Sequence, residues 1–114
     1  MSFFAVHYAY MSDSAALDAS RAEHRTYLGS LVEQGALVAS GPYVGAEPSA
    51  LLIFRADSAE AVRSMLDADP FQIAGLVEQT TITQWNPILG VFAGELELAP
   101  SVDGVLHFLL CESG

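Results

Sequence analysis

The start of the chain carries apolar side chains at both odd and even positions. Phe4 and Val6 share one parity, and Phe3 and Ala5 share the other. Such a run predicts a β-strand over residues 3–10 that is covered on both faces. Helices of the same subunit can cover one face, and the sheet of a second subunit would cover the other, so the pattern predicts a dimer.

The segment that follows has the period of a helix. The Ser-Asp-Ser run at residues 12–14 supplies candidate N-caps, and Gly35 stands where a left-handed residue can end a helix. A helix is therefore predicted from this run to Gln34. At about 100° per residue, Arg21 and His24 fall within a stripe of leucines. The pattern turns these two polar side chains toward the core.

Two strands and the start of a second helix are predicted in the middle of the chain. Residues 36–40 and residues 50–54 are strand-like runs separated by a loop rich in Gly, Glu, Pro and Ser. We expect them to pair as a hairpin with a long loop. Asp57, followed by Glu60 three residues later, resembles a capping box and predicts the start of the second helix.

The second helix is predicted to end at Asp69, because a residue that precedes proline is pushed out of the helical region. Strand character resumes over residues 77–85, which gives the order β-α-β-β-α-β. This order predicts an α+β fold of the ferredoxin-like type, with an antiparallel sheet and residues 1–90 as one domain. Residues 91–114 are predicted to be a C-terminal extension, either an added edge strand or a segment swapped into a partner subunit.

Composition adds a second reason to expect self-association. The chain has 114 residues, of which 52% are hydrophobic and 16% charged, against about 25% charged in an average soluble domain. Little polar material is left to cover the surface of a monomer. We therefore expect a homodimer or a higher homo-oligomer.

The charge balance argues against several classes of partner. Fourteen acidic residues oppose four arginines, lysine is absent, and the formal net charge is -10. Nucleic acids and anionic membranes require a cationic surface, so neither is an expected partner. A small-molecule substrate fits this charge better.

Compartment and cofactor are inferred from residues that the chain lacks. Cys111 is the single cysteine, so the fold needs no internal disulfide, and a cytoplasmic protein is expected. The N-terminus shows no leader pattern, and no apolar run reaches the ~18 residues of a membrane span. The histidines and Cys111 are too scattered for a metal site, and no phosphate loop or dinucleotide fingerprint occurs, so no cofactor is expected.

The predicted topology brings candidate chemistry to one end of the sheet. With the strands in the order four, one, three, two, the start of the first helix and the end of the second lie at the same end. His24 can then approach Asp69, and Tyr8 or Tyr10 would lie beside them. A carboxylate can orient an imidazole that exchanges protons near neutral pH, so His24 and Asp69 form a candidate general acid/base pair. Arg21 could hold an anionic group of a substrate or neutralise Asp69.

Structural roles for the same residues stay open at this point. Asp69 could be only the N-cap of a short turn that begins at Pro70. His24 could be a core histidine bonded to a backbone carbonyl, and Arg21 could be an ordinary ion-pair partner. Ser40 is at a position where serine is commonly a turn residue.

Six short motifs occur in order along the chain. They are Arg21-Ala-Glu-His24, Tyr27-Leu28, Ser40-Gly41-Pro42, Asp67-Ala68-Asp69-Pro70-Phe71, Ala74-Gly75-Leu76-Val77 and Trp85-Asn86-Pro87. Together they resemble the YCII-related (YciI-like) family over residues 3–90. The resemblance implies a dimeric α+β barrel, a fold related to that of muconolactone isomerase. It also implies that His24 and Asp69 match the family's proposed His-Asp pair, with Arg21 and Ser40 at neighbouring family positions.

The leading hypothesis is a cofactor-independent lyase or isomerase for a small cyclic metabolite, phenolic or lactone-like. The resemblance includes a dehydrochlorinase-like branch that acts on a chlorinated hydroxyhydroquinone. His24 would move the proton, Asp69 would orient the imidazole, and Arg21 with Ser40 or a tyrosine hydroxyl would stabilise oxyanion charge. The alternative is a non-catalytic small-molecule binding or accessory protein on the same fold, and a third hypothesis is a cofactor-free monooxygenase.

Overall fold

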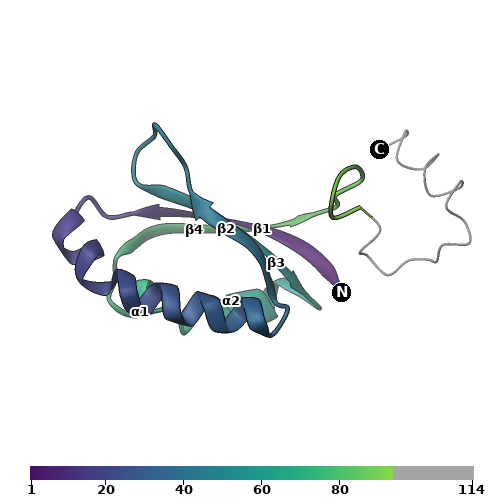
Figure 1. The fold of residues 1–114 in the computed structure, drawn as a ribbon, viewed down its shortest axis with the longest axis horizontal. Helices are drawn as coiled ribbons and strands as arrows, with labels where there is room; N and C mark the ends of the chain where they lie inside the picture. Colours follow the sequence, from purple (N-terminus) through teal and green to yellow (C-terminus); the bar gives the residue numbers. More distant parts are fainter. Residues whose placement is uncertain (94–114) are drawn as a thin grey trace, which may run out of the picture.

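The computed structural model describes residues 1–93 and shows a four-stranded antiparallel sheet with helices on one side (Figure 1). Its element order is the predicted β-α-β-β-α-β with one short helix added, so the ferredoxin-like α+β fold is confirmed. The elements are β1 (Ser2–Tyr10), α1 (Ser14–Glu33), β2 (Leu37–Pro42), β3 (Ser49–Ala56), α2 (Ala59–Asp67), α3 (Pro70–Ile73) and β4 (Val77–Trp85).

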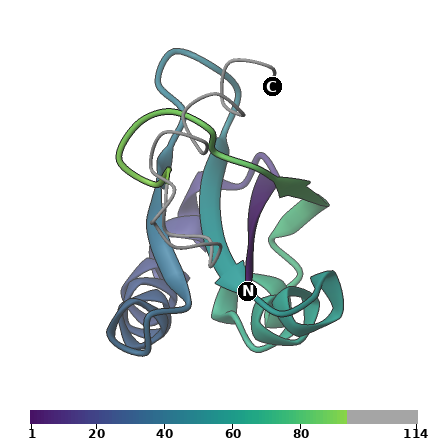
Figure 2. The same ribbon diagram turned by 90° about the vertical axis from the view of Figure 1, so that its right-hand side faces the viewer.

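The strand order in the sheet is β2-β3-β1-β4, which places the first strand between the third and the fourth. β1 pairs antiparallel with both neighbours, so Phe4 lies opposite Phe54 on β3 and opposite Gln84 on β4. A view along the long axis shows α1 and α2 side by side beneath the sheet (Figure 2). The chain leaves α2 at the end of the sheet where α1 starts, and α1 contacts α3 there.

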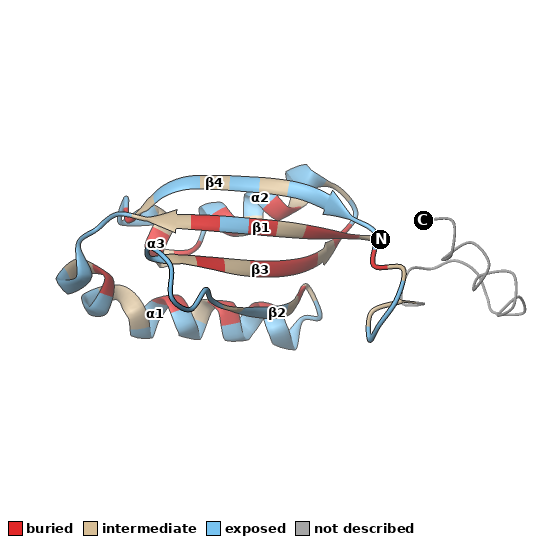
Figure 3. Ribbon diagram, turned by 90° about the horizontal axis from the view of Figure 1, so that it is seen from above, coloured by how far each residue is buried: buried red, intermediate tan, exposed pale blue. Residues whose placement is uncertain are grey.

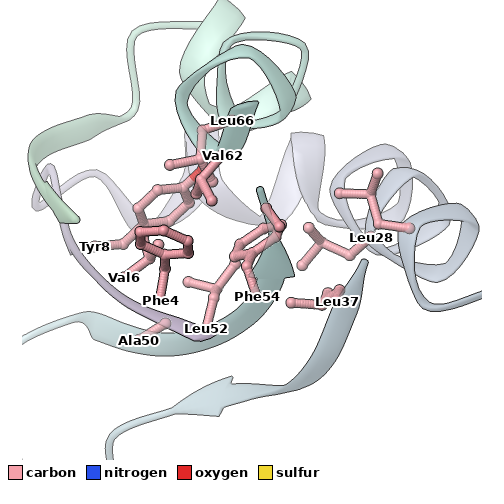
Figure 4. Packing of buried hydrophobic residues seen from close by; sticks show 12 residues of the cluster. Phe4, Val6, Tyr8, Leu28, Leu37, Ala50, Leu52, Phe54, Val62 and Leu66 are labelled. Carbon is pink, nitrogen blue, oxygen red and sulfur yellow. The ribbon is translucent and has the colours of Figure 1, made fainter. Parts of the chain in front are cut away.

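The core lies between the sheet and the two long helices. The even-numbered side chains of β1, such as Phe4 and Val6, point to the helix side and meet Phe54 of β3 and Leu66 of α2 (Figure 4). Most of the buried residues of the sheet are therefore on the two central strands, whereas β4 at the edge is largely exposed (Figure 3). This layer holds α1 in a fixed rotation, which decides where its polar side chains point.

The opposite face of the sheet carries the odd-numbered residues of β1. Near one end of this face, Phe3 is fully buried and makes ring contacts with Trp85 and with Phe92, whose centroids are 6.4 and 5.5 Å away. Near the other end, His7 is exposed, and its Nδ1 atom lies 2.7 Å from the hydroxyl of Tyr43. The residues after β4 thus turn back over part of this helix-free face.

The helix boundaries show which local signals were decisive. Asp13 caps α1 by accepting a hydrogen bond from the backbone N–H of Ala16, and Gly35 follows the helix with a φ of 80°, as predicted. The predicted cap of α2 at Asp57 is wrong. Ser58 is the cap, because its extended backbone lets its side chain accept from the N–H of Ala61.

The C-terminal extension was predicted over residues 91–114, as an edge strand or a swapped segment. Residues 91–93 form a turn, and residues 94–114 lie outside the described residues, so these predicted roles stay untested. In the part of the chain that the structure describes, no helix is both long enough and apolar enough to cross a membrane.

Candidate active site

Asp69 stands at the junction between α2 and α3, where its side chain is fully buried. Its backbone is extended, and its Oδ1 atom accepts from the N–H of Phe71 at 3.0 Å, so Asp69 is the N-cap of α3. Pro70 at the first helical position suits this start, because the missing N–H would have no helical partner. The structural role that was left open for Asp69, the N-cap of a short turn, is therefore observed.

The same carboxylate also binds His24. The Nδ1 atom of His24 lies 2.7 Å from Oδ1 of Asp69, across 45 residues of sequence. His24 is 8% exposed, and its imidazole stacks on the ring of Phe71, with centroids 3.8 Å apart and planes 4° from parallel. A carboxylate is an acceptor only, so Nδ1 is the donor and Nε2 is the ring nitrogen left for another partner.

Tyr8 completes the set of donors to Asp69. Its hydroxyl donates to Oδ2 at 2.9 Å, so the two carboxylate oxygens together accept from one imidazole, one phenol and one backbone amide. Burial raises the pKa of Tyr8, and the negative charge of Asp69 raises it further, so the hydroxyl keeps its proton. The side chain is 1% exposed and does not line the cavity described next, so in this structure the hydroxyl contacts the carboxylate and not the cavity.

A cavity of about 320 Å³ opens between α1, β2 and β3, with α3 at its base. This volume is at the lower end for small-molecule sites and suits a ligand with a single ring. Four of the predicted site residues line it, namely His24, Arg21, Ser40 and Tyr10. The remaining lining residues are Arg25, Leu28, Gly41, Pro42, Ala50, Leu52 and Phe71.

Tyr10 brings a second phenol to the cavity. Its ring packs edge-on against Tyr8 and Phe71, with centroid distances of 5.9 and 5.4 Å. Burial raises the pKa of Tyr10 to about 12, and the charge of Asp69 contributes to the rise, while Arg21 opposes it. The hydroxyl of Tyr10 is therefore protonated at neutral pH and available as a hydrogen-bond donor.

Two arginines line the cavity, although only one was predicted. Arg21 donates to the carboxylate of Asp18 at 3.1 Å and makes no ion pair with Asp69 among the described residues, so its expected role in neutralising Asp69 is not observed. Arg25 was missed. The available signal was its position four residues after Arg21, because side chains at that spacing are neighbours on a helix.

The side chains of the described residues form no metal-binding cluster. Among residues 1–93, no group of three or more His, Cys, Asp or Glu side chains is placed to hold a cation. The cavity wall combines one imidazole, two guanidinium groups and two hydroxyls with an apolar floor. Such a set can hold an uncharged or anionic organic molecule and exchange a proton with it.

Comparisons with known proteins agree with the fold. The family model of the YCII-related domain matches residues 1–86. Among solved structures, the chain is similar to 5-chloro-2-hydroxyhydroquinone dehydrochlorinase from Burkholderia phenoliruptrix AC1100, in complex with 2,5-dihydroxybenzoquinone. The two are 27% identical with a TM-score of 0.65, over 74% of this chain and 93% of that chain. The comparison with curated proteins found no match.

Proposed function

This chain belongs to the YCII-related domain family, as its motifs predicted, and on that premise we propose that it is a cofactor-independent lyase or isomerase. Its substrate would be a small cyclic metabolite, phenolic or lactone-like. The similar solved structure is that of a dehydrochlorinase bound to a quinone, which supports a small-molecule enzyme of lyase type. The size of the cavity agrees with a ligand of one ring.

One observation carries the proposal: an imidazole on the wall of the cavity is held from behind by a buried carboxylate. With Nδ1 of His24 bonded to Asp69, the lone pair of the neutral ring is on Nε2. Nε2 can take a proton from a C–H or O–H group of a bound substrate, and the Asp69 carboxylate then stabilises the imidazolium that forms.

The reaction would then follow one of two courses. In an isomerisation, His24 returns the proton to a different atom of the same substrate. In an elimination, a leaving anion departs from the atom next to the one that lost the proton, and the proton later passes to solvent. Both courses need a proton donor and acceptor but no oxidant or reductant.

Groups on the cavity wall would stabilise the negative charge that develops on a substrate oxygen. Tyr10 and Ser40 supply hydroxyl donors, and Arg21 supplies a guanidinium group. Tyr8 has a different proposed role, since its hydroxyl is bonded to Asp69 and its side chain is buried. It would position the carboxylate and thereby the imidazole.

We also propose that the protein works as a homodimer in the cytoplasm. The helix-free face of the sheet is the surface on which a second sheet could pack, and Leu51 and Ile53 of β3 contribute apolar side chains to it. Light scattering at micromolar concentration would measure the mass, and a stable monomer would contradict the dimer.

The test of the function compares His24→Gln with Glu23→Gln, the neighbouring residue on the exposed side of α1. Both variants keep the length of the helix, but only the first removes the proposed base. The probe is 5-chloro-2-hydroxyhydroquinone, the substrate named for the similar structure, and the measurement is release of chloride. We expect His24→Gln to lower the rate by about 10²- to 10⁴-fold, the usual contribution of general acid/base catalysis.

The control variant should keep the rate of the unmodified chain, and circular dichroism should show an unchanged fold for both. Equal turnover by the two variants would contradict the assignment of His24. If the unmodified chain binds single-ring probes and releases them unchanged, the alternative is favoured, namely a binding or accessory protein.

A further inference from the structure

The cavity wall is cationic in a strongly acidic protein. The chain has fourteen acidic residues and four basic ones, all arginine. Two of those four, Arg21 and Arg25, are on the wall, which contains no carboxylate side chain. Half of the positive side chains of the molecule therefore surround one small volume.

The two arginines and the imidazole form one continuous side of the cavity. Arg21, His24 and Arg25 lie at positions i, i+3 and i+4 of α1, which makes them neighbours on the helix surface. Their exposure increases in order: His24 is 8% exposed, Arg21 is half-buried, and Arg25 is exposed. A ligand that enters would thus meet the guanidinium groups near solvent and the imidazole at depth.

The arginines differ in how they are paired. Arg21 donates to Asp18 at 3.1 Å. No hydrogen bond or ion pair of Arg25 with another described side chain is observed. Like charges four residues apart repel on a helix, so the pair is unfavourable unless an anion lies between the two groups. Asp18 neutralises one of the two guanidinium charges, and the negative charge of Asp69 is fully buried behind His24. The outer part of the wall therefore keeps one positive charge, which matches a monoanion.

We propose that this pocket selects a single-ring substrate that carries a carboxylate, with Arg25 as the residue that determines this specificity. The planar fork of a guanidinium group matches the two oxygens of a carboxylate, and Arg21 adds a second, partly neutralised charge. The ring then rests on the apolar floor, which includes Leu52 and Phe71, and its reacting atom faces His24. This inference rests on the proposed function, since it identifies the substrate class of the same site.

The test uses two probes that differ in charge and little else. Salicylate and salicylamide share a ring and a phenolic hydroxyl, but only the first carries a carboxylate. Their affinities for the unmodified full chain are measured by calorimetry or by NMR titration. A hydrogen bond to a charged group changes affinity by roughly tenfold or more, so we expect salicylate to bind about tenfold tighter.

Arg25→Gln and Arg63→Gln form a matched pair of variants. Both remove one positive charge from a helix, but Arg63 is on α2 and does not line the cavity. Arg25→Gln should remove the preference for salicylate and leave the affinity for salicylamide unchanged. Arg63→Gln should keep the preference. Phenyl phosphate, with two charges on a similar ring, should bind no better than salicylate.

Four results would overturn the inference: equal binding of the two probes, no binding of either, the same loss in both variants, or tighter binding of phenyl phosphate. The measurement needs no turnover, so it separates this inference from the proposed function. Salicylate selectivity that depends on Arg25, in a chain with no catalysis by His24, would support the inference and refute the function. Turnover that depends on His24 but not on the charge of the substrate or on Arg25 would support the function and refute the inference.

Discussion

Replacement of Asp69 by asparagine tests the centre of the site, because the carboxylate joins three elements. Asparagine has almost the same shape, and its oxygen can still accept from the N–H of Phe71 and from Nδ1 of His24. Its NH₂ group then faces the hydroxyl of Tyr8, which can turn round and accept a hydrogen bond. The fold therefore has a way to accommodate the change, and what is lost is the negative charge.

The size of the effect follows from the bonds that lose this charge. The bonds from His24 and Tyr8 change from charge-assisted to neutral, and each is expected to weaken by about 1 kcal/mol. The free energy of unfolding should fall by about 2 kcal/mol, which lowers the melting temperature by roughly 8–16 °C in a domain of this size. Turnover should fall by about 10²- to 10⁴-fold, since the imidazolium has lost its counter-ion.

Asp67→Asn is the matched control. Asp67 is the last residue of α2 and is exposed, and a negative charge at the C-terminal end of a helix is slightly unfavourable. Its removal should change the stability by less than about 0.5 kcal/mol. Thermal unfolding followed by circular dichroism, together with the chloride assay, measures both quantities. If Asp69→Asn matches Asp67→Asn in melting temperature and rate, the account of the site is refuted.

Three further predictions concern the scaffold around the site. Folding raises the pKa of Tyr10 from 10.0 to about 12, so its protonated hydroxyl contributes stability that is complete below pH 10 and is lost as the pH rises through about 12. Urea unfolding between these pH values should show a smaller loss of stability for Tyr10→Phe than for the unmodified chain. An equal loss in the two proteins would contradict the role of this hydroxyl. Leu66→Ala removes a side chain that is 1% exposed and should lower the free energy of unfolding by about 2–5 kcal/mol, as measured with urea. Gly35→Ala should destabilise the protein by about 1–2 kcal/mol, because the φ of Gly35 is 80°. Gly29→Ala should stabilise it by about 0.5–1 kcal/mol, because Gly29 is inside α1 and has open space for a methyl group. If Gly35→Ala melts at a higher temperature than Gly29→Ala, α1 does not end as described.

Much of the fold was accessible from local patterns. The cap at Asp13 and the glycine at residue 35 delimit α1, because both signals act within one turn of the chain. The leucine stripe placed His24 on the buried side, since the helical period determines which residues share a face. The Asp57 cap failed for the same local reason: Ser58, one residue later, competes for the role, and the backbone conformation decides between them.

The donors to Asp69 were not accessible in this way. Sequence patterns allowed the carboxylate to be a helix cap or the partner of His24 and treated these as alternatives. The structure shows both at once, because two oxygens can accept three bonds when the carboxylate is buried at a junction of elements. Tyr8 or Tyr10 was expected beside the pair, and only the structure shows that it is the hydroxyl of Tyr8 that donates to the carboxylate.

The sequence alone determined the elements, their order, the face of α1 on which the histidine lies and the excess of negative charge. These properties depend on residue type and on separations of a few positions along the chain. Only the tertiary structure decided that an imidazole and a carboxylate 45 residues apart lie 2.7 Å from each other, and that half of the arginines surround one cavity. Such distances depend on the position and rotation of each helix on the sheet, and these are determined jointly by all the side chains that pack in the core.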